Sequence, residues 1–279
     1  MNEKLFNPDY LFSLCQNYGL RPSKEYGQNY LFNPEPIEMM LAAAAINQDD
    51  TVIEVGPGWG GLTFALTEKA KKVIAFEIEK KLEKYWADRS LENLEIVWGN
   101  VLREVENHPA IISLKSYKVV ANLPYQITSS VIRKFLESDR SPTVMVLMVQ
   151  KEVGERICAQ PGGMSLLSVA VQYYAKPEIV VGVARNNFWP EPKVDSAVIR
   201  LSSYQVKKST AETKIFFDIV KLGFANRRKL LIKNLSSLAN KSELNEIFIK
   251  IGLLPTVRAQ ELSVGDWRKL IGYLSDSKT

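Results

Sequence analysis

The 279-residue sequence predicts an α/β fold with a mostly parallel sheet, followed by a small helical domain. Over the first two-thirds, short runs rich in β-branched residues alternate with segments of helical periodicity. The runs are apolar at almost every position, which is typical of parallel strands buried on both faces beneath helices. After the polar stretch Ser202–Thr213 only helical periodicity remains. We therefore place the first domain at residues 1–204 and the second at residues 205–279.

Seven segments have the apolar, β-branched composition of strands in such a sheet. In chain order they are Thr51–Val55, Lys72–Glu77, Leu94–Trp98, Lys118–Ala121, Thr143–Val149, Glu178–Val183 and Ser196–Leu201. The last two flank the Pro-rich turn Phe188–Lys193, so we expect them to close the sheet with an antiparallel pair.

Helical periodicity separates the strands and fills the end of the chain. The helices expected in the first domain are Gly61–Lys69, Lys80–Arg89 and Thr128–Ser138. The helical stretches of the second domain are Phe216–Phe224, Lys229–Leu238, Glu243–Leu254 and Asp266–Leu274. Strand and helix thus alternate as a sheet covered by helices requires, and the tail is purely helical.

Cysteine and histidine usage excludes several kinds of site. The chain has two cysteines, Cys15 and Cys158, at no metal-ligand spacing, and a single histidine, His108. These numbers argue against a zinc site and a histidine-based catalytic triad. No stretch approaches the ~18–20 consecutive apolar residues of a membrane span, and the N-terminus lacks the features of a secretory signal. We expect a cytoplasmic monomer with reduced thiols and no bound metal.

Positive charge is concentrated at the end of the chain. The formal net charge is +5, and residues 205–279 contain 14 Lys and Arg against 7 Asp and Glu. The rest of the chain contains 22 basic and 24 acidic residues. A basic tail on a near-neutral body indicates a polyanionic partner, whereas the alternative is a solvated lysine-rich surface.

A glycine-rich turn follows the first predicted strand. Gly56, Gly58 and Gly61 fit the G-x-G-x-x-G pattern at a strand-to-helix junction, where missing side chains let a ligand approach the backbone. Glu77 ends the next strand, 21 positions beyond Gly56, where an acid accepts hydrogen bonds from ribose hydroxyls. The pattern indicates an adenosine-bearing cofactor on a Rossmann-like sheet; a turn kept only for tight packing is the alternative.

Two further residues bear on which cofactor binds. NAD brings a pyrophosphate that binds free amides at a helix N-terminus, and Pro57 removes one amide from this turn. This favours S-adenosylmethionine (SAM) over NAD. Asn100 follows the third predicted strand, where its side chain could reach the exocyclic amine of the cofactor's adenine, although Asn is also a common turn residue.

The fourth predicted strand ends in Ala-Asn-Leu-Pro-Tyr, residues 121–125. The Asn122 side-chain oxygen and the Leu123 carbonyl can accept from the two N–H bonds of an exocyclic amine, which frees its lone pair to attack a methyl donor. Pro124 fixes the chain direction, and Tyr125 can stack on a flat ring. Such a reaction depends on positioning and needs no histidine or carboxylate base. An ordinary strand-ending turn is the alternative.

These motifs together resemble the rRNA adenine N6,N6-dimethyltransferases. The matching strings are GQNYL (27–31), EVGPGWGGLT (54–63), FEIEKKL (76–82), ANLPYQIT (121–128), VQKEVGERI (149–157), LLSVAVQYY (166–174), FWPEPKVDSAVIRL (188–201), FANRRKLLIKNL (224–235) and RAQELSVGDWRKL (258–270). They cover nearly the whole chain in order. The branch that the sequence is most similar to dimethylates two adjacent adenosines near the 3′ end of small-subunit rRNA, during small-subunit biogenesis.

The resemblance implies a fold, a cofactor and the residues that bind it. The fold is that of a class I SAM-dependent methyltransferase, a seven-stranded Rossmann-like sheet with its last strand antiparallel, followed by a small C-terminal helical domain. The implied SAM site consists of Gln28, Asn29, Leu31, Gly56, Gly58, Glu77, Asn100 and Asn122. The family usually has an acid where this chain has Asn100. Its amide oxygen can still accept from the adenine amine, so we expect SAM binding to survive.

The resemblance also implies where the RNA binds. The target adenine would lie against Asn122, Leu123, Pro124, Tyr125 and Phe188, with Phe188 as the second aromatic face on a flipped-out base. In the tail, a basic cluster at the start of the second predicted helix could grip phosphates without reading sequence. Its members are Arg227, Arg228, Lys229 and Lys233. A solvated helix face is the alternative.

Three other functions share some of these features. A macrolide-resistance methylase would have the same two sites but would modify an adenine of large-subunit rRNA; the tail strings favour the small-subunit branch. A mitochondrial transcription factor related to the family would chiefly bind nucleic acid, whereas the intact motif at residues 121–125 favours catalysis. An NAD-dependent dehydrogenase would account for the glycine turn but not for the motif at residues 121–125.

Overall fold

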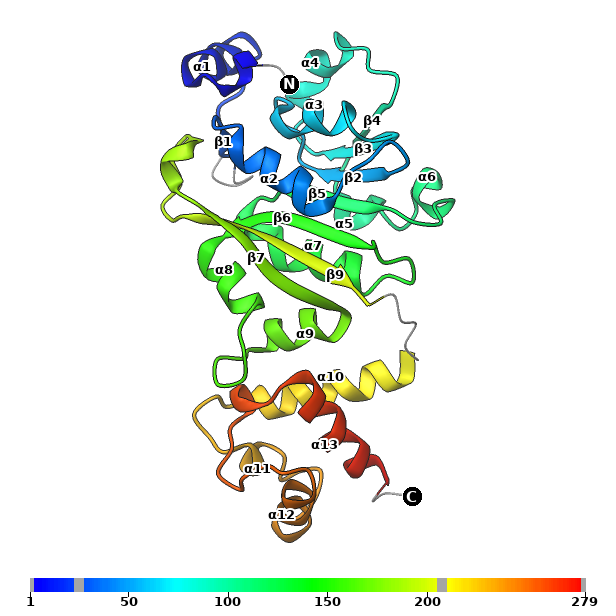
Figure 1. Ribbon diagram of the computed structural model, residues 1–279, viewed down its shortest axis with the longest axis vertical. Coiled ribbons are helices and arrows are strands. Elements are labelled where there is room, and N and C mark those ends of the chain that lie inside the picture. Colours follow the sequence, from blue (N-terminus) through cyan, green and yellow to red (C-terminus); the bar gives the residue numbers. More distant parts are fainter. Residues whose placement is uncertain (1–2, 23–27, 205–209, 277–279) are drawn as a thin grey trace. The chain divides into compact units, whose positions relative to one another are not determined.

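The computed structural model describes residues 3–22, 28–204 and 210–276 of the chain, which divides into two compact units (Figure 1). The first unit consists of Met1–Gly154 and Ala175–Gln205, and the second of Glu155–Tyr174 and Val206–Thr279. The sequence-based boundary was near Tyr204, so the structure adds residues 155–174 to the helical unit. Residues 205–209, where the predicted second domain begins, lie outside the described residues.

The first unit is built on a seven-stranded sheet. Its strands are β2 (Thr51–Val55), β3 (Lys72–Glu77), β4 (Leu94–Trp98), β5 (Lys118–Asn122), β6 (Val144–Gln150), β7 (Ala175–Val183) and β9 (Ser196–Ser203). The order across the sheet is β4-β3-β2-β5-β6-β9-β7. Neighbouring strands from β4 to β6 are parallel, and β9 is antiparallel to both β6 and β7. The last strand is therefore the antiparallel one, which confirms the predicted fold class.

Helices connect the parallel strands and build the core of the first unit. They are α2 (Glu35–Ala44), α3 (Gly61–Thr67), α4 (Glu83–Ala87), α5 (Val101–Glu104), α6 (Pro109–Ile112) and α7 (Thr128–Leu136). The helix α8 (Lys151–Ile157) begins in the first unit and ends in the second. The fully buried Met40 of α2 and Leu66 of α3 share one core cluster with Val52, Val120 and Val146 of the sheet. This packing holds the carboxyl ends of the strands at fixed positions.

A small second sheet joins segments that are far apart in the sequence. β1 (Tyr30–Leu31), which follows the N-terminal helix α1 (Pro8–Asn17), pairs antiparallel with β8 (Phe188–Trp189). Leu31 lies opposite Phe188 in this pair. Asn187 extends the pairing with two further hydrogen bonds. Its carbonyl accepts from the Phe32 N–H at 3.0 Å, and its Oδ1 accepts from the side-chain amide of Asn33 at 2.8 Å. The pairing brings the N-terminal segment to the predicted base-binding residue Phe188.

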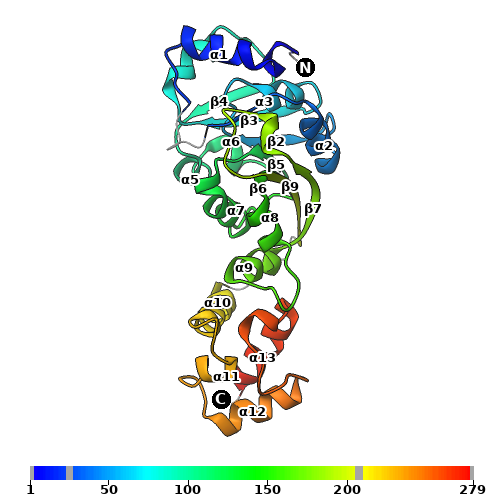
Figure 2. The ribbon, with the colours of Figure 1, turned by 90° about the vertical axis from the view of Figure 1, so that its left-hand side faces the viewer.

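The second unit is helical and has its own core. Its helices are α9 (Leu166–Tyr174), α10 (Thr210–Phe224), α11 (Leu231–Asn234), α12 (Lys241–Lys250) and α13 (Val264–Asp276), of which the last four are grouped together in Figure 2. Val169 and Tyr173 of α9 belong to the same buried cluster as Val220, Phe248 and Trp267. The segment at 155–174 is therefore part of this core. None of the helices among the described residues has the length and apolarity needed to cross a bilayer.

The helix α11 is shorter than the stretch Lys229–Leu238 predicted from periodicity. Leu230 is extended, with φ −61° and ψ 146°, and the Leu231 N–H donates to the Val257 carbonyl at 2.8 Å. This bond to a distant segment takes the place of a helical one, so the helix begins only at Leu231. Residues 225–230 form the turn between α10 and α11 instead of a helix start.

Candidate active site

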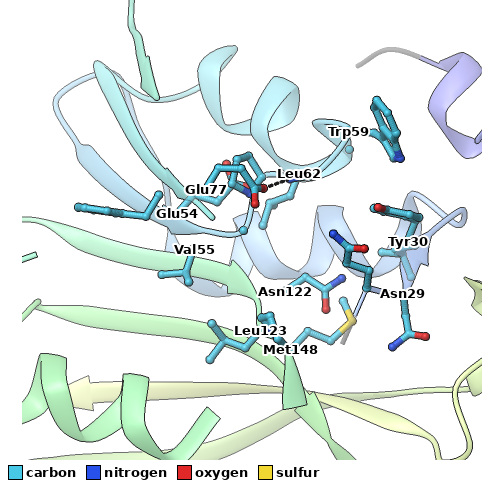
Figure 3. Close-up of a pocket in the computed structure, with 18 of the residues that line it drawn as sticks. Asn29, Tyr30, Glu54, Val55, Trp59, Leu62, Glu77, Asn122, Leu123 and Met148 are labelled. Carbon is cyan, nitrogen blue, oxygen red and sulfur yellow. Dashed lines mark hydrogen bonds between the residues drawn. The ribbon is translucent and has the colours of Figure 1, made fainter. Parts of the chain in front are cut away.

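A cavity of about 200 Å³ lies in the first unit, at the carboxyl ends of β2, β3 and β5. It brings together all the residues predicted for the cofactor and for the target base. These are Gln28, Asn29, Leu31, Gly56, Gly58, Glu77, Asn100, Asn122, Leu123, Pro124, Tyr125 and Phe188. Figure 3 shows Glu77 and Asn122 at the ends of their strands, with Asn29 and Tyr30 on another side of the cavity. The predicted roles of the single residues stay predictions.

The glycine turn connects β2 to α3 and forms one wall of the cavity. Gly56 has φ 75° and Gly58 has φ 52°, a left-handed conformation that side chains disfavour. A Cβ atom at Gly58 would lie 3.3 Å from the Tyr30 ring. Two side chains of α4 fasten the turn: the Tyr85 hydroxyl donates to the Trp59 carbonyl at 2.6 Å, and the Trp86 indole N–H donates to the Gly58 carbonyl at 3.1 Å. The backbone that would face the cofactor is thereby held rigid.

Gly60→Ala is expected to destabilise the turn by about 2–4 kcal/mol, because strain and overpacking add. Gly60 has φ 93°, and an added Cβ would lie 2.5 Å from Phe64 Cε2 and 2.9 Å from Trp86 Cη2. Urea unfolding would measure the loss. Gly162→Ala is the control, since φ is 104° there and no atom lies within 4 Å of the added Cβ. An equal loss at both glycines would mean that the aromatic contacts do not matter.

Glu77, at the end of β3, is buried and fixed by three backbone N–H groups. Its Oε2 accepts from Gly58 at 3.1 Å, and its Oε1 accepts from Ile78 and from Glu79, each at 2.8 Å. Burial raises the pKa of the carboxyl group, and these three donors act in the opposite direction. A carboxylate has about four acceptor positions, so Glu77 keeps capacity for a further donor such as a ribose hydroxyl.

Asn100 lies beside Glu77 at the edge of the cavity. The Gly99 N–H donates to the Glu77 carbonyl at 2.8 Å, which places the end of β4 next to the end of β3. The Asn100 side chain caps α5, because its Oδ1 accepts from the Leu102 N–H at 3.0 Å. An amide oxygen has two lone pairs, so one remains for the predicted contact to an adenine amine.

The end of β5 presents the predicted base-binding motif to the cavity. Asn122 is the last residue of β5, and the Leu123 N–H donates to the Met148 carbonyl of the neighbouring strand at 3.2 Å. Tyr125 begins a 3₁₀ turn, and its hydroxyl lies 2.8 Å from the Ser196 hydroxyl. Burial raises the pKa of Tyr125, so its hydroxyl stays protonated at neutral pH. Phe188, only 3% exposed, lines the same cavity.

The four basic residues of the predicted RNA-binding cluster lie elsewhere, in the second unit. Arg227, Arg228 and Lys229 are in the turn before α11, and Lys233 is on α11. All four are exposed. Within the described parts of the chain, none of them forms an ion pair. Their charges are therefore available to a polyanion.

Sequence reasoning missed Glu54, a buried acid in the wall of the cavity. Glu54 lies in β2 and is 1% exposed, and among the described residues its Oε2 has no hydrogen-bond partner. Burial raises the pKa of Glu54 to about 8, and the charge of Glu77 adds to the rise. An acid inside the otherwise apolar run Thr51–Val55 was the signal in the sequence.

Glu54 is expected to make the stability of the protein fall with rising pH. Its pKa is higher in the folded chain than the ~4.3 of an unfolded glutamate. The folded state therefore holds this proton more tightly, and stability is lost as the pH rises from about 4.3 through 8. Between pH 5 and 8 the wild type should lose about 3 kcal/mol relative to Glu54→Gln, measured by urea unfolding. Equal pH slopes for both proteins would contradict the assignment.

The fold and the cavity define a class I methyltransferase: a seven-stranded, mostly parallel sheet has its last strand antiparallel, and the cavity lies at the carboxyl ends of the parallel strands. Residues 19–276 match the model of the ribosomal RNA adenine dimethylase family. The chain belongs to that family.

Several known proteins are similar over most of their length. Two curated relatives are named ribosomal RNA small subunit methyltransferase A. The relative from Dehalococcoides mccartyi (strain 195) is 38% identical over 92% of this chain and 90% of its own. The relative from Clostridioides difficile (strain 630) is 39% identical over 94% of each.

Solved structures show the same fold. A dimethyladenosine transferase from Plasmodium falciparum superposes with a TM-score of 0.73 and 26% identity, over 89% of this chain and 98% of that one. The 23S rRNA methyltransferase ErmE has a TM-score of 0.69 and 23% identity, over 88% of this chain and 99% of its own. The latter similarity concerns the fold alone.

Proposed function

We propose that the protein transfers methyl groups from SAM to N6 of two adjacent adenosines near the 3′ end of small-subunit rRNA, giving N6,N6-dimethyladenosine. The observation that carries the proposal is the cavity itself. It places the amide of Asn122 and two aromatic side chains, Tyr125 and Phe188, beside the glycine turn and Glu77. A cofactor site and a base site in one cavity are what direct methyl transfer requires.

The donors and acceptors of the cavity fit SAM. Glu77 has acceptor capacity for the ribose hydroxyls, and Asn100 for the adenine amine. Gln28, Asn29 and Leu31 line the part of the cavity that the family resemblance assigns to the methionine end. Bound there, SAM would supply an electrophilic methyl group on a sulfonium.

The residues at the end of β5 would prepare the target amine. The Asn122 Oδ1 and the Leu123 carbonyl would accept from its two N–H bonds, so that the nitrogen lone pair turns out of the ring plane and toward the methyl group. Tyr125 and Phe188 would hold the two faces of the flipped-out base. The amine becomes acidic as the new carbon–nitrogen bond forms, so its proton can pass to water, and catalysis rests on orientation.

The named relatives favour small-subunit RNA over the alternatives. Both are called small subunit methyltransferases, and they match nearly the whole chain, including the helical tail. The proposed partner is an immature small ribosomal subunit, which implies a cytoplasmic location; we expect a monomer that needs no metal. The large-subunit reaction and a purely nucleic-acid-binding role are the competing functions.

The decisive experiment is incubation of the protein with labelled SAM and unmodified small or large ribosomal subunits. Nucleoside mass spectrometry and mapping would identify the product. We expect dimethyladenosine at two adjacent positions of small-subunit rRNA. Label in large-subunit rRNA would support the resistance-type reaction, and label in neither would support a binding role.

The basic cluster is expected to bind phosphates of the RNA. Replacing Arg227, Arg228 and Lys229 together by alanine should raise KM for small subunits about tenfold and make the salt dependence of binding shallower, because fewer counterions are released. The control is Lys214→Ala with Lys221→Ala on α10, whose charges are near Asp218. Binding titrations at several salt concentrations would show the difference. An unchanged salt slope in the triple variant would contradict a phosphate contact.

A further inference from the structure

Ser196, at the start of β9, is in direct contact with the aromatic side chain of the base motif. Its hydroxyl lies 2.8 Å from the Tyr125 hydroxyl, although 71 positions separate the two residues. Ser196 is fully buried, and it pairs with Gln150 of β6 on one side and with Val183 of β7 on the other. Because β9 pairs with a strand on each side, the position of Ser196 is fixed. Its hydrogen bond therefore restricts the movement of the half-buried Tyr125 ring.

The preceding residue, Asp195, holds the segment that carries the other aromatic side chain. Its Oδ1 accepts from the Arg185 N–H at 3.0 Å, and its carbonyl accepts from the Lys151 N–H at 2.9 Å. Arg185 begins the 3₁₀ turn Arg185–Asn187, which leads directly into Phe188. Asp195 thus fixes the turn before Phe188, and at the same time ties β9 to the start of α8.

We propose that Asp195 and Ser196 are positioning residues for adenine methylation, which together set the places of the Phe188 and Tyr125 rings around the base. This inference rests on the function proposed above. Neither residue needs to touch the RNA or SAM. Ser196 acts through the Tyr125 hydroxyl and Asp195 through the turn before Phe188, so that the first residue of β9 and the residue just before it control both faces of the base site.

The arrangement matters because the site must align a flat base twice. Stacking energy falls off when a gap of even 0.5–1 Å opens beside a ring, and a misplacement of about 1 Å can cost about 100-fold in rate. After the first transfer the amine carries a methyl group and one remaining N–H, so one of its two anchoring hydrogen bonds is gone. The second transfer therefore depends more on the rings, and a loosened Tyr125 should release N6-monomethyladenosine.

The test compares Ser196→Ala, Tyr125→Phe and the double variant in methylation of small subunits. Loss of one neutral hydrogen bond should lower kcat about three- to tenfold, raise the fraction of monomethyladenosine, and leave SAM affinity within about twofold. Because both single changes break the same bond, the double variant should be no slower than the slower single variant. Ser202→Ala, on the same strand but away from the cavity, is the matched control and should behave as wild type.

Three results would overturn the assignment of Ser196. Rate losses that multiply in the double variant would show that the two hydroxyls act independently. Losses of SAM affinity and unfolding temperature in Ser196→Ala, as large as the loss of kcat, would show a merely structural role. A wild-type protein that methylates neither subunit would instead refute the proposed function, and an active wild type with an equally active Ser196→Ala variant refutes only the positioning role.

Asp195 is tested by a conservative pair. Asp195→Asn keeps the oxygen that accepts from the Arg185 N–H and should retain kcat within about twofold, whereas Asp195→Ala should lower kcat about three- to tenfold without changing SAM affinity. Equal activities of the two variants would contradict a role through this hydrogen bond. A fluorine label on Tyr125, incorporated as 3-fluorotyrosine, gives a readout without catalysis: Ser196→Ala should shift its resonance, and an unshifted resonance would contradict the contact.

Discussion

Asn122→Ala is expected to lower kcat for adenine methylation by about 10²- to 10³-fold, the effect of removing one preorganised hydrogen-bonding group from an active site. The alanine cannot accept from the N–H of the target amine, so the lone pair would stay delocalised into the ring. SAM affinity should fall by no more than about tenfold. Single-turnover rates with small subunits and SAM titrations would separate the two effects.

Asn122→Asp is the matched control for this change. It keeps an oxygen at the end of β5 that can accept from the amine, so it should retain far more activity than the alanine variant. An alanine variant as active as wild type would exclude the proposed role of Asn122. If SAM binding and kcat fell together to the same degree, Asn122 would belong to the cofactor site alone.

Tyr125→Ala is expected to reduce kcat/KM for the RNA about 5- to 150-fold, the equivalent of losing one base–aromatic stack of about 1–3 kcal/mol. SAM affinity should stay close to that of wild type, because the ring is assigned to the base and not to the cofactor. Tyr125→Phe keeps the stacking surface and loses only the hydrogen bond to Ser196, so its loss should stay within about three- to tenfold. Equal losses of RNA methylation and SAM affinity in Tyr125→Ala would show that the ring supports the cofactor site or the fold.

The central sheet and the positions of its polar residues could be predicted from the sequence. Parallel strands buried on both faces appear as continuous apolar runs, so the end of each run locates the end of a strand. The resemblance to the dimethyltransferases placed Gly56, Glu77 and Asn122 in one SAM site, and these residues do line one cavity, because the ends of parallel strands meet at one edge of the sheet. Local pattern was sufficient because each of these residues directly follows or ends its own strand.

Features that depend on distant segments could not be predicted in this way. β1 is only two residues long and exists because it pairs with β8. No local pattern distinguishes Ser196 from other serines, because its contact with the Tyr125 hydroxyl forms only in the folded chain. The helix predicted at residues 229–238 begins only at Leu231, whose N–H donates to the Val257 carbonyl. The pairing of β1 and the Ser196–Tyr125 contact leave no signal in the local periodicity. At Leu231 a tertiary hydrogen bond overrides the local helical preference.

The split of the helical unit into residues 155–174 and 206–279 has a consequence for how the protein is made. On the ribosome, Val169 and Tyr173 are synthesised before Phe216 and Trp267, with which they share a core. At about 5–20 residues per second, the apolar side of α9 waits several seconds for its partners while the strands β7 and β9 are still being added. A stop codon or protease cut after Tyr204 would leave the apolar side of α9 exposed, because its partners would be missing. A protein truncated there should therefore bind chaperones and aggregate.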